Sequence, residues 1–269
     1  MKLLCTVRDC RYPLALESRR AVCERGHSFD IARSGYLNLL QPQDRRAKVP
    51  GDSPQAVAAR RRFLDRGFAK PLLDAMLALL LPIDGPVLDA GCGEGYHLGA
   101  IAADERYGVD ISTAAIDAAA KRYPDCSWII ANADRFLPFA DGSFQTVLSI
   151  TARLNPEEFR RVLAGDGRLL IAIPGDDDLV ELRGMTRDRV QRTVEMFTPH
   201  FTLAKREHVK HVAELDEQSA ADLLESTYRR VKPRAGPVTM SRDLLLFTSS
   251  SRTDACTARS PLPPACPQG

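Results

Sequence analysis

The sequence predicts an α/β fold: an open, mostly parallel sheet of seven strands, preceded by a small N-terminal module. Three observations lead to this prediction. From residue 86 onward, short apolar runs alternate with segments of helical spacing, which is typical of strands that are buried on both faces and joined by helices. A glycine-rich stretch follows the first of these runs. Three cysteines and a histidine are crowded into the first thirty residues.

The length and composition of the chain are those of a globular protein. Its 269 residues are enough for a large domain and a small one, and a hydrophobic content of 44% suits a buried core. No apolar run approaches the roughly eighteen residues of a membrane span, and the first twenty residues are polar and arginine-rich. We therefore expect a cytoplasmic protein with no membrane partner, whose seven cysteines do not form disulfides.

The first forty residues are predicted to be short strands and turns around a Cys/His cluster. Cys5, Cys10, Cys23 and His27 follow the spacing C-x4-C-x12-C-x3-H, which is typical of a tetrahedral zinc site. A segment this short has too little apolar content to fold alone, and metal ligation supplies stability in such cases. The sequence therefore predicts a zinc-binding module over residues 1–40. The alternative is a set of reduced structural cysteines.

Residues 41–85 are predicted to form a basic linker and two helices. The stretch "QPQDRRAKVPGDSP" is polar and contains prolines, whereas "QAVAARRRFLDRG" and "AKPLLDAMLALLL" have helical spacing. Residues 1–70 carry 15 Lys and Arg against 7 Asp and Glu, a net charge of +8. Such a basic front end indicates a polyanionic partner, unless its arginines only solubilise the module. The expected phosphate contacts are Arg45, Arg46, Lys48, Arg60, Arg61 and Arg62.

Residues 86–250 carry the strands of the predicted sheet. The first five runs are "PVLDAG", "YGVDI", "SWIIAN", "QTVLSI" and "RLLIAI", and helical patterns such as "STAAIDAAAKRY" lie between them. A strand-like "FTLAKREHV", a helix "EQSAADLLES" and a last strand "DLLLFT" complete the seven. The Ser/Pro-rich end over residues 251–269 has no apolar pattern, and we expect it to be disordered.

The stretch "VLDAGCGEGYH" indicates a cofactor site. Asp89 ends a buried strand, and Gly91, Gly93, Glu94 and Gly95 form the turn into a helix. In a dinucleotide fingerprint the third glycine comes one residue later, and an acid before the loop disfavours a bound pyrophosphate. The pattern favours instead a cofactor with a cationic amino-acid end, S-adenosylmethionine (SAM). We expect these five residues to contact it.

Two further acids follow the next two strands. Asp110 can accept hydrogen bonds from both ribose hydroxyls, a role that an acid has after the second strand of Rossmann-like folds. Asp134 can receive the adenine amino group, with Phe136 or Leu137 packed nearby. Alternatively, Asp110 caps a helix and Asp134 only forms a turn. The three signals in order predict a methyltransferase.

Four stretches together resemble the 23S rRNA (guanine-N1)-methyltransferases, a group that includes a housekeeping enzyme and macrolide-resistance relatives. They are "CERGHSFDIARSGYLNLL", "GDS…AARRRFLDRG", "VLDAGCGEGYH" and "AAAKRYP", and the resemblance spans about residues 3 to 250. It implies a class I SAM-dependent methyltransferase domain, a zinc module that recognises RNA, and a guanine in a 23S rRNA hairpin as the substrate. A role in antibiotic resistance is also among its implications.

The chain departs from the family around the target pocket. An aromatic-Ala-Pro segment after the fourth strand is replaced by Thr151-Ala152-Arg153, and positions occupied in relatives by a tyrosine and a histidine hold Ala69 and Asp178. Methylation at guanine N1 requires removal of the ring proton. We expect Arg153 to stabilise the charge on O6 and Asp178, or another acid of its loop, to accept the proton.

Two other functions remain open at this point. The fold can have been recruited to methylate a small molecule, such as an antibiotic intermediate, with the altered segment marking a remodelled pocket. The chain can also be a non-catalytic RNA-binding relative that keeps the cofactor site as a scaffold. We expect no DNA partner, and the sequence leaves a homodimer open.

Overall fold

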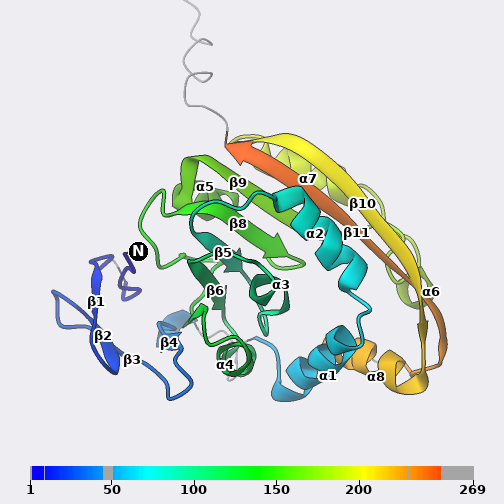
Figure 1. Cartoon of the computed structure of the whole chain (residues 1–269), viewed down its shortest axis with the longest axis horizontal. Helices are drawn as coiled ribbons and strands as arrows, with labels where there is room; N and C mark the ends of the chain where they lie inside the picture. Colours follow the sequence, from blue (N-terminus) through cyan, green and yellow to red (C-terminus); the bar gives the residue numbers. More distant parts are fainter. Residues whose placement is uncertain (1, 9, 45–50, 229–230, 250–269) are drawn as a thin grey trace, which may run out of the picture.

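One mixed sheet organises the chain, and all seven predicted strands belong to it (Figure 1). The computed structural model describes residues 2–8, 10–44, 51–228 and 231–249. The strand order is β10-β11-β9-β8-β5-β6-β7-β4, and within the seven predicted strands only β11 runs against the others. The seven strands are β5 (Val87–Ala90), β6 (Arg106–Asp110), β7 (Ser127–Ile130), β8 (Phe144–Ile150), β9 (Leu163–Pro174), β10 (Phe201–Leu215) and β11 (Gly236–Ser249).

Helices cover both faces of this sheet. Residues of α2, α3 and α4 pack in the apolar cluster on one face, and residues of α5 and α7 pack in the cluster on the other. Two covered faces explain why the central strands are apolar throughout instead of alternating. The helices are α1 (Pro54–Asp65), α2 (Lys70–Leu80), α3 (Tyr96–Gly99), α4 (Thr113–Arg122), α5 (Pro156–Val162), α6 (Val180–Arg183), α7 (Arg189–Phe197) and α8 (Glu217–Ser226).

The two helices predicted before the sheet are α1 and α2. Helix α1 begins where the sequence indicates, because the Ser53 side chain caps it by accepting a hydrogen bond from the Ala56 amide, with Pro54 as its first residue. Helix α7 was not predicted from the sequence because its buried face is small: Thr193 and Phe197 are its buried residues. The predicted disordered end, residues 251–269, lies outside the described residues.

The N-terminal module is joined to the edge of the large sheet. It contains a three-stranded antiparallel sheet, a two-residue strand and a short 3-10 helix; these are β1 (Leu14–Leu16), β2 (Arg20–Cys23), β3 (Ser28–Asp30), β4 (Leu37–Asn38) and η1 (Pro42–Asp44). Strand β4 pairs in parallel with β7, which adds an unpredicted eighth strand. Leu3 and Phe29 share an apolar cluster with Phe139. The module and the α/β body therefore have a continuous core.

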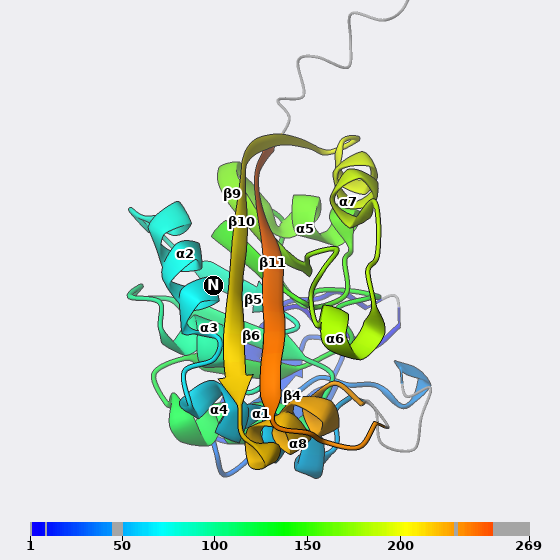
Figure 2. The ribbon, with the colours of Figure 1, turned by 90° about the vertical axis from the view of Figure 1, so that its right-hand side faces the viewer.

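A lobe beyond the carboxyl ends of the strands completes the fold. The long ribbon of β10 and β11 extends past the sheet to α8, as Figure 2 shows. Helices α1 and α8 pack against each other there, and Phe63 of α1 joins Leu223 of α8 and Met240 of β11 in a third apolar cluster. Among the described residues, no helix is long and apolar enough to cross a membrane.

Candidate active site and zinc cluster

A cavity of about 1200 Å³ lies at the carboxyl ends of the central strands. Its lining residues come from the turn after β5, the ends of β6 and β8, helices α1 and α8, and the middle parts of β10 and β11. Ligands of open α/β sheets bind at this edge. The volume is enough for a nucleoside cofactor and part of a second substrate.

The loop after β5 requires glycine at two positions, because the backbone has a positive φ there and a side chain would collide with its neighbours. Gly91 and Gly95 have φ values of +86° and +81°. A Cβ atom on Gly91 would lie 2.4 Å from Cβ of Ala152, and one on Gly95 would lie 2.4 Å from the ring of Trp128. These contacts are too close for any side chain. The loop is thus fixed between the β8 turn and the aromatic residue of β7.

Asp110 holds the same loop from the next strand. Its Oδ2 atom accepts a hydrogen bond from the Gly93 amide at 2.9 Å, and its Oδ1 atom accepts one from the Ser112 amide at 2.8 Å. Burial raises the pKa of Asp110, and these two backbone hydrogen bonds oppose the rise. The structure therefore brings two residues of the predicted cofactor site into direct contact.

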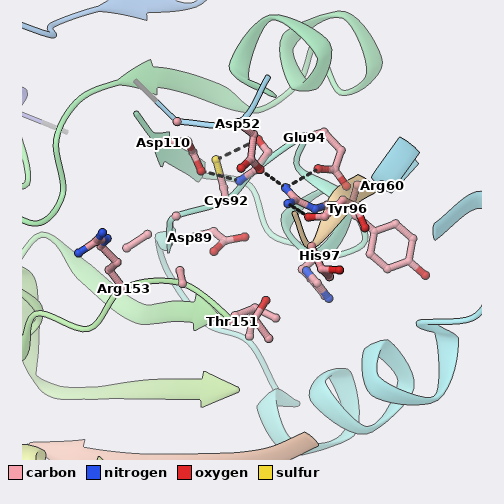
Figure 3. Close-up of a pocket in the computed structure, with 18 of the residues that line it drawn as sticks. Asp52, Arg60, Asp89, Cys92, Glu94, Tyr96, His97, Asp110, Thr151 and Arg153 are labelled. Atoms are coloured by element: carbon pink, nitrogen blue, oxygen red, sulfur yellow. Dashed lines mark hydrogen bonds and ion pairs between the residues drawn. The ribbon is translucent and has the colours of Figure 1, made fainter. Parts of the chain in front are cut away.

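Asp89 is a buried carboxyl group that lacks a donor. Neither of its oxygens has a hydrogen-bond partner among the described residues, and its exposed fraction is 1%. Desolvation raises its pKa to about 8, and the negative charges of Asp110 and Glu94 add to the rise. Figure 3 shows Asp89 at the centre of the cavity. A buried group of this kind is complementary to a cation, and SAM carries a sulfonium and an ammonium.

Arg60 lies over the glycine loop, where sequence analysis did not expect it. Its guanidinium forms an ion pair with Asp52, lies 3.9 Å from an Oε atom of Glu94 and donates to the Ser226 carbonyl at 3.0 Å (Figure 3). Burial raises the pKa of Glu94, while the charge of Arg60 opposes that rise. Arg60 and Asp52 therefore line the cavity although motif spacing did not indicate them, because their approach to the loop depends on how α1 packs.

The expectation that Arg60, Arg61 and Arg62 contact phosphate stays a prediction. Each has a carboxylate partner within the chain: Arg62 pairs with Asp222 at 2.6 Å, and Arg61 lies 3.9 Å from Asp65. The side chains of Arg61 and Arg62 are nevertheless 42% and 54% exposed. The other expected contacts, Arg45, Arg46 and Lys48, lie outside the described residues.

The turn after β8 has a strained backbone that faces the glycine loop. Thr151 has a φ of +53°, which a β-branched residue rarely adopts. Such strain is frequent at functional sites. The side chain of Arg153 is 84% exposed, and its Nε atom lies 3.3 Å from an Oδ atom of Asp134. Thr151 and Arg153 both line the cavity, as predicted from the sequence.

The aromatic and apolar residues expected beside the adenine are elsewhere. Leu137 is fully buried in the core. Phe136 lies under two guanidinium groups, those of Arg11 and Arg161. Neither residue lines the large cavity.

Asp178 lines the cavity but is engaged in an ion pair. It is 2% exposed, and its Oδ1 atom accepts hydrogen bonds from the Ser241 amide and from the Arg242 guanidinium. This arrangement favours a structural role and weakens the expectation that Asp178 accepts a proton. His97 lines the same cavity, and its Nε2 atom has no partner among the described residues. Burial lowers the pKa of His97 to about 4, with a further contribution from Arg242, so its imidazole is neutral at pH 7.

The predicted metal ligands meet in the N-terminal module. The ligand atoms of Cys5, Cys10, Cys23 and His27 all lie within 4.8 Å of one another. Two cysteine sulfurs, of Cys10 and Cys23, are 3.8 Å apart, and the Nδ1 atom of His27 is 3.4 Å from Sγ of both Cys5 and Cys23. Around a tetrahedral zinc, ligand atoms at about 2.0–2.3 Å from the metal are roughly 3.4–3.8 Å apart. The four side chains therefore have the donor types and the donor–donor distances of a tetrahedral zinc site.

Comparisons with known proteins agree with both sites. A family model described as a methyltransferase domain matches residues 87–170, and one described as the N-terminal part of RlmA, a zinc ribbon, matches residues 5–48. The chain is 34% identical to the 23S rRNA (guanine(748)-N(1))-methyltransferase of Streptomyces fradiae over 78% of this chain and 79% of that protein. It is 35% identical to YxjB of Bacillus subtilis, which is named provisionally as a 23S rRNA (guanine-N1)-methyltransferase. This similarity covers 79% of this chain and 81% of that protein.

A solved structure shares the fold. The Haloferax volcanii methyltransferase in complex with the Trm112 methyltransferase activator superposes with a TM-score of 0.51 at 21% identity. The superposition covers 75% of this chain and 99% of that chain.

Proposed function

Because the chain belongs to the family of 23S rRNA (guanine-N1)-methyltransferases, we propose that it methylates N1 of a guanine in a 23S rRNA hairpin, with SAM as the methyl donor. The observation that carries the proposal is the buried, unpartnered carboxyl group of Asp89 beside the glycine loop. A site with this feature is complementary to the cationic end of SAM, and the order of strands and acids around it suits a nucleoside.

The proposed cofactor contacts are residues of three neighbouring turns. Asp110, half-buried at the end of β6, accepts hydrogen bonds from the ribose hydroxyls, and Asp134 accepts one from the adenine amino group. SAM, when bound, would supply a methyl group on a sulfonium: the in-line nucleophile bonds to the methyl carbon, and the thioether S-adenosylhomocysteine leaves. The residues expected around the amino-acid end are Asp89, Gly91, Gly93, Glu94 and Gly95.

The remaining task of the protein is to help guanine N1 lose its proton. We assign stabilisation of the developing charge on O6 to Arg153, whose guanidinium is exposed at the cavity mouth. Asp178 and His97 both line the cavity as acceptors of the N1 proton. The Nε2 atom of His97 has no partner among the described residues, but burial lowers the pKa of His97 to about 4, which makes its imidazole a weak base. The Asp178 carboxylate pairs with Arg242, and both residues stay candidates for the acceptor.

The division of labour along the chain belongs to the same proposal. Residues 1–40, with zinc on Cys5, Cys10, Cys23 and His27, recognise the RNA, and residues 86–250 carry out methyl transfer. Residues 41–85 connect the two and contribute Asp52 and Arg60 to the cavity. With ribosomal RNA as the partner, the protein acts in the cytoplasm; a homodimer stays a prediction.

A labelled methyl-transfer assay tests the proposal. Purified protein is incubated with tritiated SAM and 23S rRNA from a strain that lacks the modification. We expect label in the RNA, and we expect Asp110→Ala to raise the dissociation constant for SAM about tenfold to a hundredfold, the effect of leaving buried hydroxyl donors unpaired. Asp125→Ala, on an exposed turn, is the matched control. Label in a small metabolite and none in RNA would contradict the proposal.

A further inference from the structure

A second, smaller hollow of about 130 Å³ lies between the N-terminal module and the turn after β7. Arg8 and Arg11 line it from the module, and Arg135 and Phe136 line it from the turn. Arg8 and Arg135 also line the large cavity, so the hollow opens beside the cavity mouth. We call this hollow, defined by Arg8, Arg11, Arg135 and Phe136, the arginine groove.

The arginine groove and the large cavity differ in the charged residues that line them. Within the described residues, no acidic side chain lines the groove. The large cavity, by contrast, is lined by six carboxylates, Asp52, Asp89, Glu94, Asp110, Asp134 and Asp178, and by five arginines, Arg8, Arg60, Arg135, Arg153 and Arg242. The cavity therefore has charges of both signs, whereas the groove at its mouth has arginines without acids among the described residues and is suited to an anion.

The groove is held in shape by contacts on both of its sides. The guanidinium of Arg11 lies 4.8 Å from the centroid of the Phe136 ring, and so does that of Arg161. The backbone of Arg11 has a φ of +49°, a conformation that few non-glycine residues adopt. These contacts fix a guanidinium in place before a ligand arrives, which lowers the entropy lost on binding.

Backbone hydrogen bonds fasten the module to the wall of the groove. The Leu4 amide donates to the Pro138 carbonyl at 2.9 Å, and the Leu39 amide donates to the Ile130 carbonyl at 2.9 Å. The Thr6 hydroxyl donates to the Leu39 carbonyl at 2.5 Å. The arginines of the two sides are thus kept facing one groove.

We propose that the arginine groove binds a backbone phosphate of a nucleotide next to the target guanine; this rests on the proposed function. A base enters such a cavity only when it is turned out of its stack, and its flanking phosphates then lie at the mouth. Guanidinium groups bind phosphate oxygens with two hydrogen bonds in fixed geometry. The N-terminal module and the turn after β7 therefore both contact the RNA, on two sides of the mouth of the large cavity.

A charge-reversal experiment on the full-length, zinc-loaded protein tests the groove. The probe is unmodified 23S rRNA transcript, and its binding is measured by filter retention over a series of KCl concentrations. We expect Arg8→Glu with Arg135→Glu to weaken binding at least tenfold and to reduce the log–log salt slope by about 2. Zinc content should not change, and SAM affinity is measured beside RNA binding because both arginines also line the large cavity. Arg8→Lys with Arg135→Lys should keep the wild-type salt slope but bind more weakly than the wild type, because lysine keeps the charge without the two-bond geometry.

The matched control is Arg19→Glu with Arg33→Glu, which changes the net charge equally at exposed positions of the same module that line neither hollow. We expect it to weaken binding less than threefold. Two results would contradict the proposed phosphate site but not the proposed function. The first is an equal loss of RNA affinity in the two double variants. The second is no loss of RNA affinity in Arg8→Glu with Arg135→Glu while the wild type methylates the transcript. A wild-type protein that neither binds nor methylates the transcript would overturn the proposed function together with the phosphate site.

Discussion

The zinc cluster and the cofactor cavity are built in opposite ways. All four zinc ligands come from residues 5 to 27, and their donor atoms lie within 4.8 Å of one another. The described lining of the cavity, by contrast, is drawn from segments between Arg8 and Arg242, with acids from three separate turns around one loop. A site built from one short segment depends on local spacing, whereas a site built from many segments depends on how the whole fold packs.

Removal of the metal should separate the two sites most strongly. We expect Cys23→Ser to reduce the zinc content from about one per chain to near zero, because four ligands are required for a closed structural site. The melting temperature should fall, since the module shares a core with Phe139 of the α/β body. Zinc is measured by atomic emission, and SAM affinity by calorimetry at low temperature should change less than tenfold. Loss of SAM binding along with the zinc would show that the two sites are not separable.

Substitution in the glycine loop should do the reverse. We expect Gly95→Ala to lower SAM affinity at least a hundredfold while zinc is retained, because the new methyl group would lie 2.4 Å from the Trp128 ring. Gly142→Ala is the matched control: Gly142 also has a positive φ, +63°, but a Cβ there meets nothing within 4 Å. Both variants are measured by calorimetry and metal analysis. Equal losses in the two variants would mean that backbone strain, not the contact with Trp128, is responsible.

Proton uptake and release should also distinguish the cavity from the zinc cluster. The pKa of Asp89 is raised to about 8 in the free protein, so this carboxyl group is protonated at pH 7. A bound cation lowers that pKa, and binding then releases a proton. SAM affinity should therefore rise from pH 6 to pH 8 and level off above, and calorimetry at pH 7 in buffers of different ionisation enthalpy should show release of up to about one proton.

The neighbouring acids Asp110 and Glu94 also have raised pKa values, so the variant Asp89→Asn isolates the contribution of Asp89. In the absence of ligand, the folded-state pKa of Asp89 lies above its unfolded value. Its contribution to stability is thus complete below about pH 4 and is lost as the pH rises towards 8. Asp89→Asn should flatten this slope; an unchanged slope would mean that another group titrates.

The smallest effect is expected at the edge of the cavity. Arg60→Gln should lower SAM affinity about threefold to tenfold, because Asp52 and Glu94 lose their shared cation and the loop loses a support. Arg61→Gln is the control, since Arg61 lies on the same helix and pairs with the exposed Asp65. If Arg61→Gln weakens RNA binding more than SAM binding, this result would indicate that Arg61 contacts an RNA phosphate.

The difference between the sites also explains what the sequence could predict. Ligand spacing predicted the zinc cluster, and Gly93 and Asp110 were assigned to one cofactor site because both lie at the carboxyl ends of strands of a parallel sheet. The central strands were predicted because their runs are apolar on both faces, whereas the edge strand β10 was predicted only from a strand-like run. Arg60 over the loop, the ion pair of Asp178 with Arg242, and the pairing of β4 with β7 could not be predicted. Each depends on contacts between residues far apart in the chain.

The identity of the methylated nucleoside tests the central claim most directly. Unmodified 23S rRNA is incubated with the protein and SAM, digested to nucleosides and separated by chromatography with mass detection, and a second portion is reverse-transcribed. The account predicts 1-methylguanosine as the new nucleoside and a single new stop at one guanine, because methylation at N1 blocks the Watson–Crick edge. A different methylated nucleoside, or no new stop on 23S rRNA with full SAM binding, would contradict it.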